Sequence, residues 1–328
     1  MFYSLCIALC LAVMSLVFAA AVTLSIPAIK LARAALRTAP PRTQARAWLF
    51  LRLAPFALAA MVSLGLALPA FLEFEPPSTG EMVEWPLLAL AAAGAALLLV
   101  VAVRLARMMF ATRALERRWI ARAQRFHVAG VWCPVYAVTD VESLLAVTGI
   151  FRPQVFVSRE VAEALSQEEL SAALAHELAH VRRFDNLQQL LLKSTQLPLG
   201  AFRAADAEWS SASEIAADEG AVHGGASALE LSSALIKVGR LSGGQIAPAR
   251  LAASHLVPCG CGGSTGERIA HLRRLLEIDD ASWLAQRAAD GPVRLGKIVT
   301  ALAFSAAYVV GVGSLLPAVH KALEFLVR

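Results

Sequence analysis

Two histidines and a glutamate occur in this chain at a spacing that is typical of metal-dependent hydrolases. They belong to the run His176-Glu177-Leu178-Ala179-His180. On a helix, side chains four residues apart project from one face, so both imidazoles can offer a ring nitrogen to one metal ion. Glu177 points away from that axis and can act as general base on a metal-activated water. The pattern predicts a Zn²⁺ site that carries out hydrolysis.

A zinc ion held by two histidines needs a third protein ligand and an open fourth position. The extended motif HExxHxxGxxH is excluded, because Arg183 and Asn186 stand where its glycine and third histidine would be. The remaining solution is an acid on a later helix. We expect Glu214 to be the ligand and Asp218, one turn further on, to orient a ligand imidazole. Spacing alone leaves other candidates open: Asp206, Glu208, Glu219 and His223.

Signals around the motif predict the helix that carries it. Ser166 and Glu169 form a capping box, in which each side chain satisfies a backbone amide of the other residue. Apolar residues then recur at helical spacing, and arginines stand in the last turn, where cations favour the helix dipole. Asp185 follows. We expect it to cap the next helix, with Gln188 at the third position, in preference to supporting the site.

A short strand is expected just before this helix, at Gln154, Val155, Phe156 and Val157, after Pro153. An exposed strand edge can pair with an extended peptide through backbone hydrogen bonds. We therefore predict that these four residues bind the substrate by strand addition, against the alternative of a plain structural strand.

The composition indicates a membrane protein. Of the 328 residues 58% are hydrophobic and only 17% charged, whereas soluble domains are about half apolar and a quarter charged. Four segments are long and apolar enough to cross a bilayer: residues 1–29, 53–72, 85–103 and 298–319. Residues 30–52 and 73–84 are the expected loops, 104–297 the expected peptidase domain, and 320–328 a short external tail.

The charges beside these segments predict the orientation. Basic residues without acids follow the first apolar segment, acids without bases follow the second, and arginines follow the third. By the positive-inside rule, the amino terminus is outside and residues 104–297 are cytoplasmic. The arginines stand beside apolar segments, so the net charge of +5 indicates membrane topology and no direct nucleic-acid binding. The five scattered cysteines fit a reducing compartment.

The expected fold is a mainly α membrane protein with four transmembrane helices. An α+β, zincin-like metallopeptidase domain lies between the third and the fourth. The stretch from Arg268 to Leu275, rich in arginine and leucine, is expected to be an amphipathic helix lying against the domain or the membrane face.

The runs ELSAALAHELAHVRRFDN and SEIAADEGAV resemble the integral-membrane metallopeptidases of the beta-lactam sensor-transducer (antirepressor) family, of gluzincin type. They are more distantly similar to the CAAX prenyl proteases and the heat-shock membrane proteases. The strong resemblance covers residues 135–222. It implies zinc ligands at His176, His180 and Glu214, a catalytic base at Glu177 and a trailing acid at Asp218, and it also implies an edge strand before the active-site helix.

The resemblance implies a zinc-dependent endopeptidase of a bacterial cytoplasmic membrane. Its substrate would be a cytoplasmic or membrane-proximal protein, such as a transcriptional repressor cleaved in regulatory signalling. We do not expect beta-lactam sensing, since this chain lacks the drug-binding domain that follows the last span in the sensor-transducers. Any signal would then come through the spans, the acidic outer loop or a partner, and the candidate partners are a second copy of the chain and a sensor protein. The alternatives are a quality-control protease for membrane proteins and a zinc-binding signalling scaffold with little hydrolysis.

Overall fold

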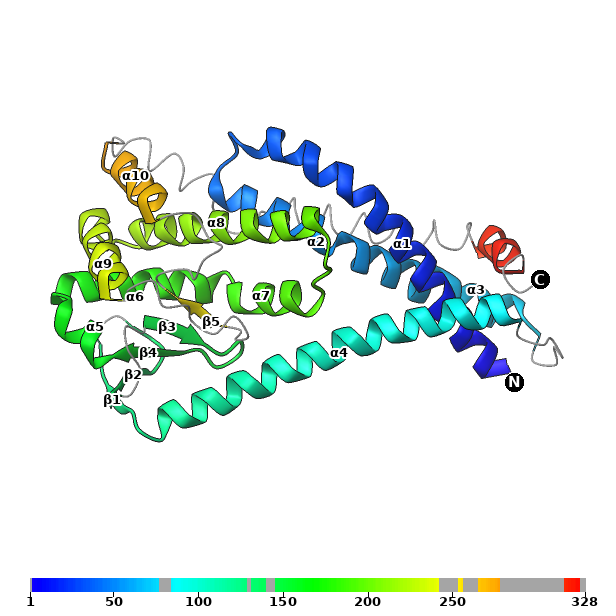
Figure 1. Cartoon of the computed structure of the whole chain (residues 1–328), viewed down its shortest axis with the longest axis horizontal. Helices are drawn as coiled ribbons and strands as arrows, with labels where there is room; N and C mark the ends of the chain where they lie inside the picture. Colours follow the sequence, from blue (N-terminus) through cyan, green and yellow to red (C-terminus); the bar gives the residue numbers. More distant parts are fainter. Residues whose placement is uncertain are drawn as a thin grey trace. The chain divides into compact units, whose positions relative to one another are not determined.

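The computed structural model describes residues 2–76, 84–128, 131–139, 145–241, 253–255, 265–277 and 316–324. The chain forms two compact units. The first unit comprises Met1–Ala28, Leu53–Val101 and Ile278–Arg328, and the second comprises Ile29–Arg52 and Ala102–Glu277. Figure 1 shows the elements in chain order.

Long apolar helices build the first unit. By length and composition, three helical stretches among the described residues could each cross a bilayer. They are α1 (Phe2–Leu36), the stretch Pro41–Phe74, and α4 (Trp85–Ile120). The second stretch consists of α2 (Pro41–Val62), a π-helical turn (Ser63–Ala67) and α3 (Leu68–Phe74). These three helices fit a membrane protein.

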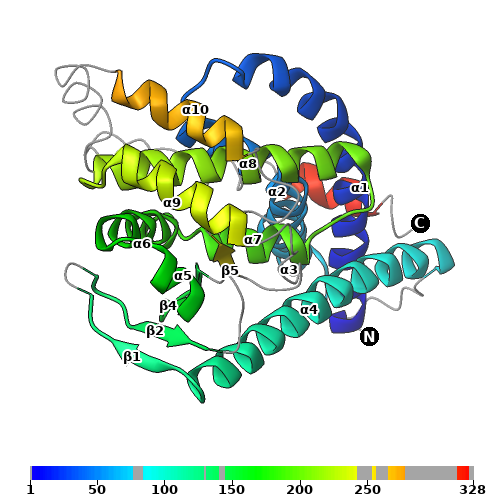
Figure 2. The same ribbon diagram turned by 60° about the vertical axis from the view of Figure 1, so that its left-hand side comes forward.

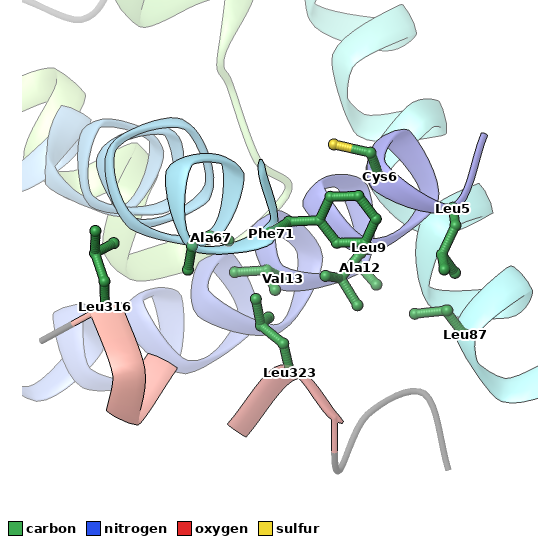
Figure 3. Packing of buried hydrophobic residues seen from close by; sticks show 11 residues of the cluster. Leu5, Cys6, Leu9, Ala12, Val13, Ala67, Phe71, Leu87, Leu316 and Leu323 are labelled. Atoms are coloured by element: carbon green, nitrogen blue, oxygen red, sulfur yellow. The ribbon is translucent and has the colours of Figure 1, made fainter. Parts of the chain in front are cut away.

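Buried side chains from these helices form one apolar cluster (Figure 3). Leu9 of α1, Phe71 of α3 and Leu87 of α4 meet there, each almost fully buried. Leu316 and Leu323 join them from residues 316–324, which are helical. Of the fourth span expected at residues 298–319, the part before residue 316 lies outside the described residues.

Small residues allow close contacts inside the first unit. A Cβ atom at Gly94 of α4 would lie only 2.3 Å from the carbonyl oxygen of Leu11 in α1, so only glycine fits there. The hydroxyl of Ser15 donates to the Leu90 carbonyl oxygen at 2.9 Å. The close backbone approach and the hydrogen bond both hold α1 against α4.

The described part of the second unit contains a five-stranded sheet in the order β1-β2-β4-β3-β5. The strands are β1 (Gln124–Phe126), β2 (Val135–Val138), β3 (Leu145–Thr148), β4 (Gln154–Ser158) and β5 (Ala253–His255). β2 and β4 are parallel, and the other neighbours are antiparallel. A tight turn joins β3 to β4 at Gly149, whose φ of +86° favours glycine.

Helices pack on this sheet and on one another. They are α5 (Arg159–Ala164), α6 (Gln167–Arg182), α7 (Asp185–Ser194), α8 (Gly200–His223), α9 (Ala228–Leu241) and α10 (Thr265–Leu276). α6 contacts β3 on one side and α8 and α9 on the other, and α10 packs on α8 and α9 (Figures 1 and 2). The helix that carries both histidines is therefore the centre of the second unit.

Residues 30–52, expected as a separate basic loop, are largely helical and belong to the second unit. α1 continues to Leu36 and α2 begins at Pro41, a residue well suited to a first helical position. Arg52 attaches this segment to the rest of the second unit. It is fully buried, forms an ion pair with Asp206 of α8 at 2.8 Å, and donates to the carbonyl oxygen of Thr195 at 3.0 Å.

Candidate metal centre

Helix α6 starts at the expected capping box. The Ser166 hydroxyl accepts from the Glu169 amide at 3.2 Å, and the Glu169 carboxylate accepts from the Ser166 amide at 2.7 Å. Glu169 also accepts from Ser233 and Lys237 of α9, at 2.5 and 2.7 Å. The first turn of α6 is thereby fixed both to its own backbone and to a neighbouring helix.

Three side chains converge on one point in the buried interior. The Nε2 atoms of His176 and His180 are 3.1 Å apart. On α8, Oε2 of Glu214 lies 3.6 Å from Nε2 of His176, and Oε1 lies 3.6 Å from Nε2 of His180. In a tetrahedral zinc site with bonds of about 2.0–2.1 Å, neighbouring ligand atoms are about 3.3 Å apart. The separations therefore fit one small metal ion, and these three residues form a group that could hold one.

A carboxylate contacts the Nδ1 atom of each imidazole, on the side of the ring opposite to Nε2. The Nδ1 atom of His176 lies 2.8 Å from Asp218, and the Nδ1 atom of His180 lies 2.7 Å from Asp185. Because an ionised carboxylate only accepts hydrogen bonds, each Nδ1 carries a proton, so Nε2 is the ring atom that can bind a metal once it has no proton of its own. This is the support that zinc-binding histidines commonly receive.

The expectation that Asp185 caps α7 is wrong. The residue before α7 is Phe184, which has a left-handed backbone conformation, and no side chain caps that helix. The Asp185 carboxylate is instead buried, where it accepts from His180 and from the Ser213 hydroxyl at 2.9 Å. The ring N–H of His180 and the hydroxyl of Ser213 lie within hydrogen-bond distance of this carboxylate inside the protein, so it binds them and not the backbone amides of α7.

Arg183 ties the end of α6 to α8. Its guanidinium donates to the carbonyl oxygen of Ser213 at 2.9 Å and to the Ser213 hydroxyl at 3.2 Å. Ser213 directly precedes Glu214 in the chain. The contact therefore fixes the position of Glu214 on α8 relative to the histidines on α6.

Glu177 is fully buried beside this group. Its carboxylate oxygens make no hydrogen bond of normal geometry with the described residues, although the backbone amide of Val147 is near. Burial raises the pKa of Glu177 to about 8; His176 and, more weakly, the Val147 amide oppose the shift, and the nearby Glu214 adds to it. A buried carboxylate with open lone pairs is suited to exchange a proton with a small molecule such as water.

A residue not foreseen as part of the site is Arg268 of α10. Its side chain is fully buried and donates to both oxygens of Asp218, at 2.8 and 2.6 Å. Its Nη1 lies 3.1 Å from Glu214. Burial opposes the charge of both acids, but Arg268 lowers the pKa of Glu214 and of Asp218 below their ordinary values. The sequence does hold a signal: Arg268 shares the apolar face of α10 with Leu272 and Leu275.

The charges of the site also fit a divalent cation. Once Glu177 and both histidines have lost their protons, as metal binding requires, four buried carboxylates face two guanidinium groups and two negative charges remain for a divalent cation to balance. The carboxylates are those of Glu177, Asp185, Glu214 and Asp218, and the guanidinium groups those of Arg183 and Arg268. One oxygen of Glu214 also lacks an aligned hydrogen bond among the described residues. A divalent metal would balance the excess negative charge and would also bind the Glu214 oxygen.

The competing ligand candidates lie elsewhere. Asp206 pairs with Arg52, and Glu208 pairs with Arg33 at 3.0 Å. Glu219 lies 3.1 Å from His271, and the Nδ1 of His223 lies 2.6 Å from the Glu219 carbonyl oxygen. None of these four residues belongs to the group of ligand atoms found among the described residues.

The expected substrate strand is present as β4, but it is not an edge strand. β2 pairs along one side of β4 and β3 along the other, and Val155, Phe156 and Val157 are fully buried. The prediction that Gln154–Val157 pairs with the substrate is therefore wrong, because neighbouring strands already pair with both edges of β4. The strand nearest to α6 is β3, whose outer side pairs with β5 (Figure 1).

Asn186 of α7 holds β3 in this place. Its side-chain amide donates to the carbonyl oxygens of Val147 and Gly149, at 3.3 and 3.1 Å. Asn186 directly follows Asp185, so one end of α7 secures both the His180 imidazole and the strand beside it. The sequence showed Asn186 only as a departure from the HExxHxxGxxH pattern.

A buried HExxH helix with a distal glutamate, together with the three apolar helices found in the described part of the chain, is typical of a membrane-associated metallopeptidase. The family model described as BlaR1 peptidase M56 matches residues 11–253, more than half of the chain. The chain belongs to this family, as the resemblance implied. No curated protein and no solved structure matches it.

Proposed function

We propose that this protein is a zinc-dependent endopeptidase in which His176, His180 and Glu214 bind the metal. The observation that supports this most directly is the convergence of the two Nε2 atoms and the Glu214 carboxylate, with 3.1–3.6 Å between them. Nitrogen and carboxylate ligands in a tetrahedral arrangement favour zinc. Asp218 and Asp185 would hold the imidazoles in the tautomer that binds it.

Zinc, when bound, supplies a Lewis acid that lowers the pKa of a coordinated water and polarises the scissile carbonyl. The residues of the chain then move the protons. Glu177 takes a proton from the attacking water and later delivers it to the nitrogen of the leaving amine. Burial raises the pKa of Glu177 to about 8, so both of its protonation states are accessible near neutral pH and it can take the proton and later give it up.

The substrate in this proposal is a cytoplasmic or membrane-proximal protein, and the cleavage is regulatory, with a transcriptional repressor as the expected kind of target. Family membership supports a role in signalling. The arginines that follow α1 and lie in the second half of α4 support a cytoplasmic peptidase unit, by the positive-inside rule.

The experiment compares the full-length protein with Glu177→Gln, both purified in detergent with one equivalent of zinc. Casein and a quenched peptide library serve as general substrates. We expect the wild type to hydrolyse peptide bonds and Glu177→Gln to retain the metal but lose at least about 99% of the activity, since removal of a general base costs about 10²–10⁴-fold. Equal cleavage by both proteins would contradict the mechanism.

The regulatory role has its own test. New protein amino termini are compared in cells that express the wild type or Glu177→Gln. One or a few cleaved proteins, a transcriptional repressor among them, would support regulation. Cleavage of many unrelated membrane proteins would instead indicate quality control.

A further inference from the structure

Helix α10 brings one charged side chain to the metal centre from far along the sequence. Arg268 lies 50 residues after Asp218 and 92 after His176, yet it contacts both. Its guanidinium is fully buried. A charge buried this deeply needs well-aligned partners, and every one named here belongs to the proposed site.

The contacts of Arg268 divide between two acids on successive turns of α8. Nε and Nη2 donate to the two oxygens of Asp218, and Nη1 faces Glu214 at 3.1 Å. Two carboxylates four residues apart on a helix repel each other. The guanidinium between them removes this repulsion and fixes the distance between the metal ligand and the acid that orients His176.

One oxygen of Asp218 serves two donors. Oδ1 lies 2.6 Å from Nη2 of Arg268 and 2.8 Å from Nδ1 of His176. If Asp218 rotated, it would lose both donors together. Nη2 of Arg268 also lies 3.4 Å from both ring nitrogens of His176, so Arg268 contacts the imidazole directly as well as through Asp218. A lysine cannot reproduce its planar fork.

We propose that Arg268 is a positioning residue of the metal centre, which makes α10 part of the zinc site. This rests on the proposed function. Arg268 would hold Asp218 and Glu214 in the arrangement that zinc requires, and it would raise zinc affinity without coordinating the metal.

The test measures the zinc dissociation constant of the full-length protein by competition with a chelator. Arg268→Gln should raise it about 10–100-fold, the range typical of residues that support metal ligands. Arg268→Lys should fall between this variant and the wild type. The matched control is His271→Gln, which removes another α10–α8 contact, to Glu219, and should leave the constant unchanged.

Two further readouts separate positioning from simple helix docking. The effects of Arg268→Gln and Asp218→Asn should not add, because both interrupt the same chain of contacts. In cobalt-substituted protein, Arg268→Gln should change the visible absorption of the metal, and His271→Gln should not.

Wild-type affinity in Arg268→Gln would overturn the inference. So would equal losses in Arg268→Gln and His271→Gln, or additive effects with Asp218→Asn. If Arg268→Gln does not fold, wild-type affinity in Arg268→Lys overturns it. A wild type that binds no zinc would instead overturn the proposed function, and this inference with it.

Discussion

The Nδ1 atom of His176 lies 2.8 Å from Oδ1 of Asp218, and both side chains are fully buried. This contact holds the proton on Nδ1 and turns Nε2 toward His180 and Glu214. We expect Asp218→Asn to weaken zinc binding about 10–100-fold, measured by chelator competition. Glu219→Gln, the next acid on α8, is the control and should bind zinc as the wild type does. Equal losses in both variants would contradict the role of Asp218.

Asp185 should behave in the same way toward His180. Asp185→Asn removes the charge 2.7 Å from Nδ1 of His180, and we expect zinc affinity to fall about 10–100-fold. Ser213→Ala removes only one donor to Asp185, so its loss should be smaller. If Asp185 were a helix cap, the midpoint of thermal unfolding would drop while zinc affinity stayed the same.

Zinc binding should strengthen as the pH rises. Burial opposes a charged imidazole, but Asp218 outweighs it and raises the pKa of His176 to about 9. Zinc must displace this proton, so affinity should fall about tenfold per pH unit below about pH 9 for each proton released. The measurement is the zinc dissociation constant between about pH 6 and about pH 9. An affinity that stays flat over this range would show that no proton is displaced.

Two glycines on helices should respond to alanine with opposite signs. Gly94→Ala places a Cβ atom 2.3 Å from the Leu11 carbonyl oxygen, so α1 and α4 must separate, at a cost of about 1–3 kcal/mol. Gly239→Ala on α9 meets nothing within 4 Å and should stabilise by about 0.5–1 kcal/mol. Thermal unfolding in detergent measures both. A stabilised Gly94→Ala would show that the close contact is not required.

The helix cap of α6 offers a stability change apart from the chemistry. Ser166→Ala removes the acceptor for the Glu169 amide and should lower the free energy of unfolding by about 1 kcal/mol. Zinc affinity should not change, since Glu169 keeps its contacts with Ser233 and Lys237. A large loss of zinc from this variant would mean that the start of α6 positions the histidines.

The parts of the site that are local in sequence could be predicted from it. The capping box, the helix and the facing histidines all depend on residues within one segment, 166–180. Glu214 and Asp218 needed the family resemblance, because spacing alone left four other candidates. The long apolar helices followed from composition, although α1 and α4 extend past the expected spans, through residues that favour helix.

Pairings between distant segments could not be predicted. β4 has the pattern of any short apolar strand, and its central place depends on β2 and β3, which join it from both sides. The Asp185 carboxylate could cap α7 or support the His180 imidazole. Only the nearness of His180 and Ser213 in the folded chain decides for the second role. Arg268 belongs to the site because α10 packs on α8, a tertiary contact that no local pattern encodes.

The most direct test of the account is the zinc content of purified full-length protein, determined by mass spectrometry of the metal. We expect close to one equivalent in the wild type and in Glu177→Gln, and almost none in Glu214→Ala, because two imidazoles alone hold zinc weakly. A wild type without zinc, or a Glu214→Ala variant that retains a full equivalent, would contradict the metal centre described above.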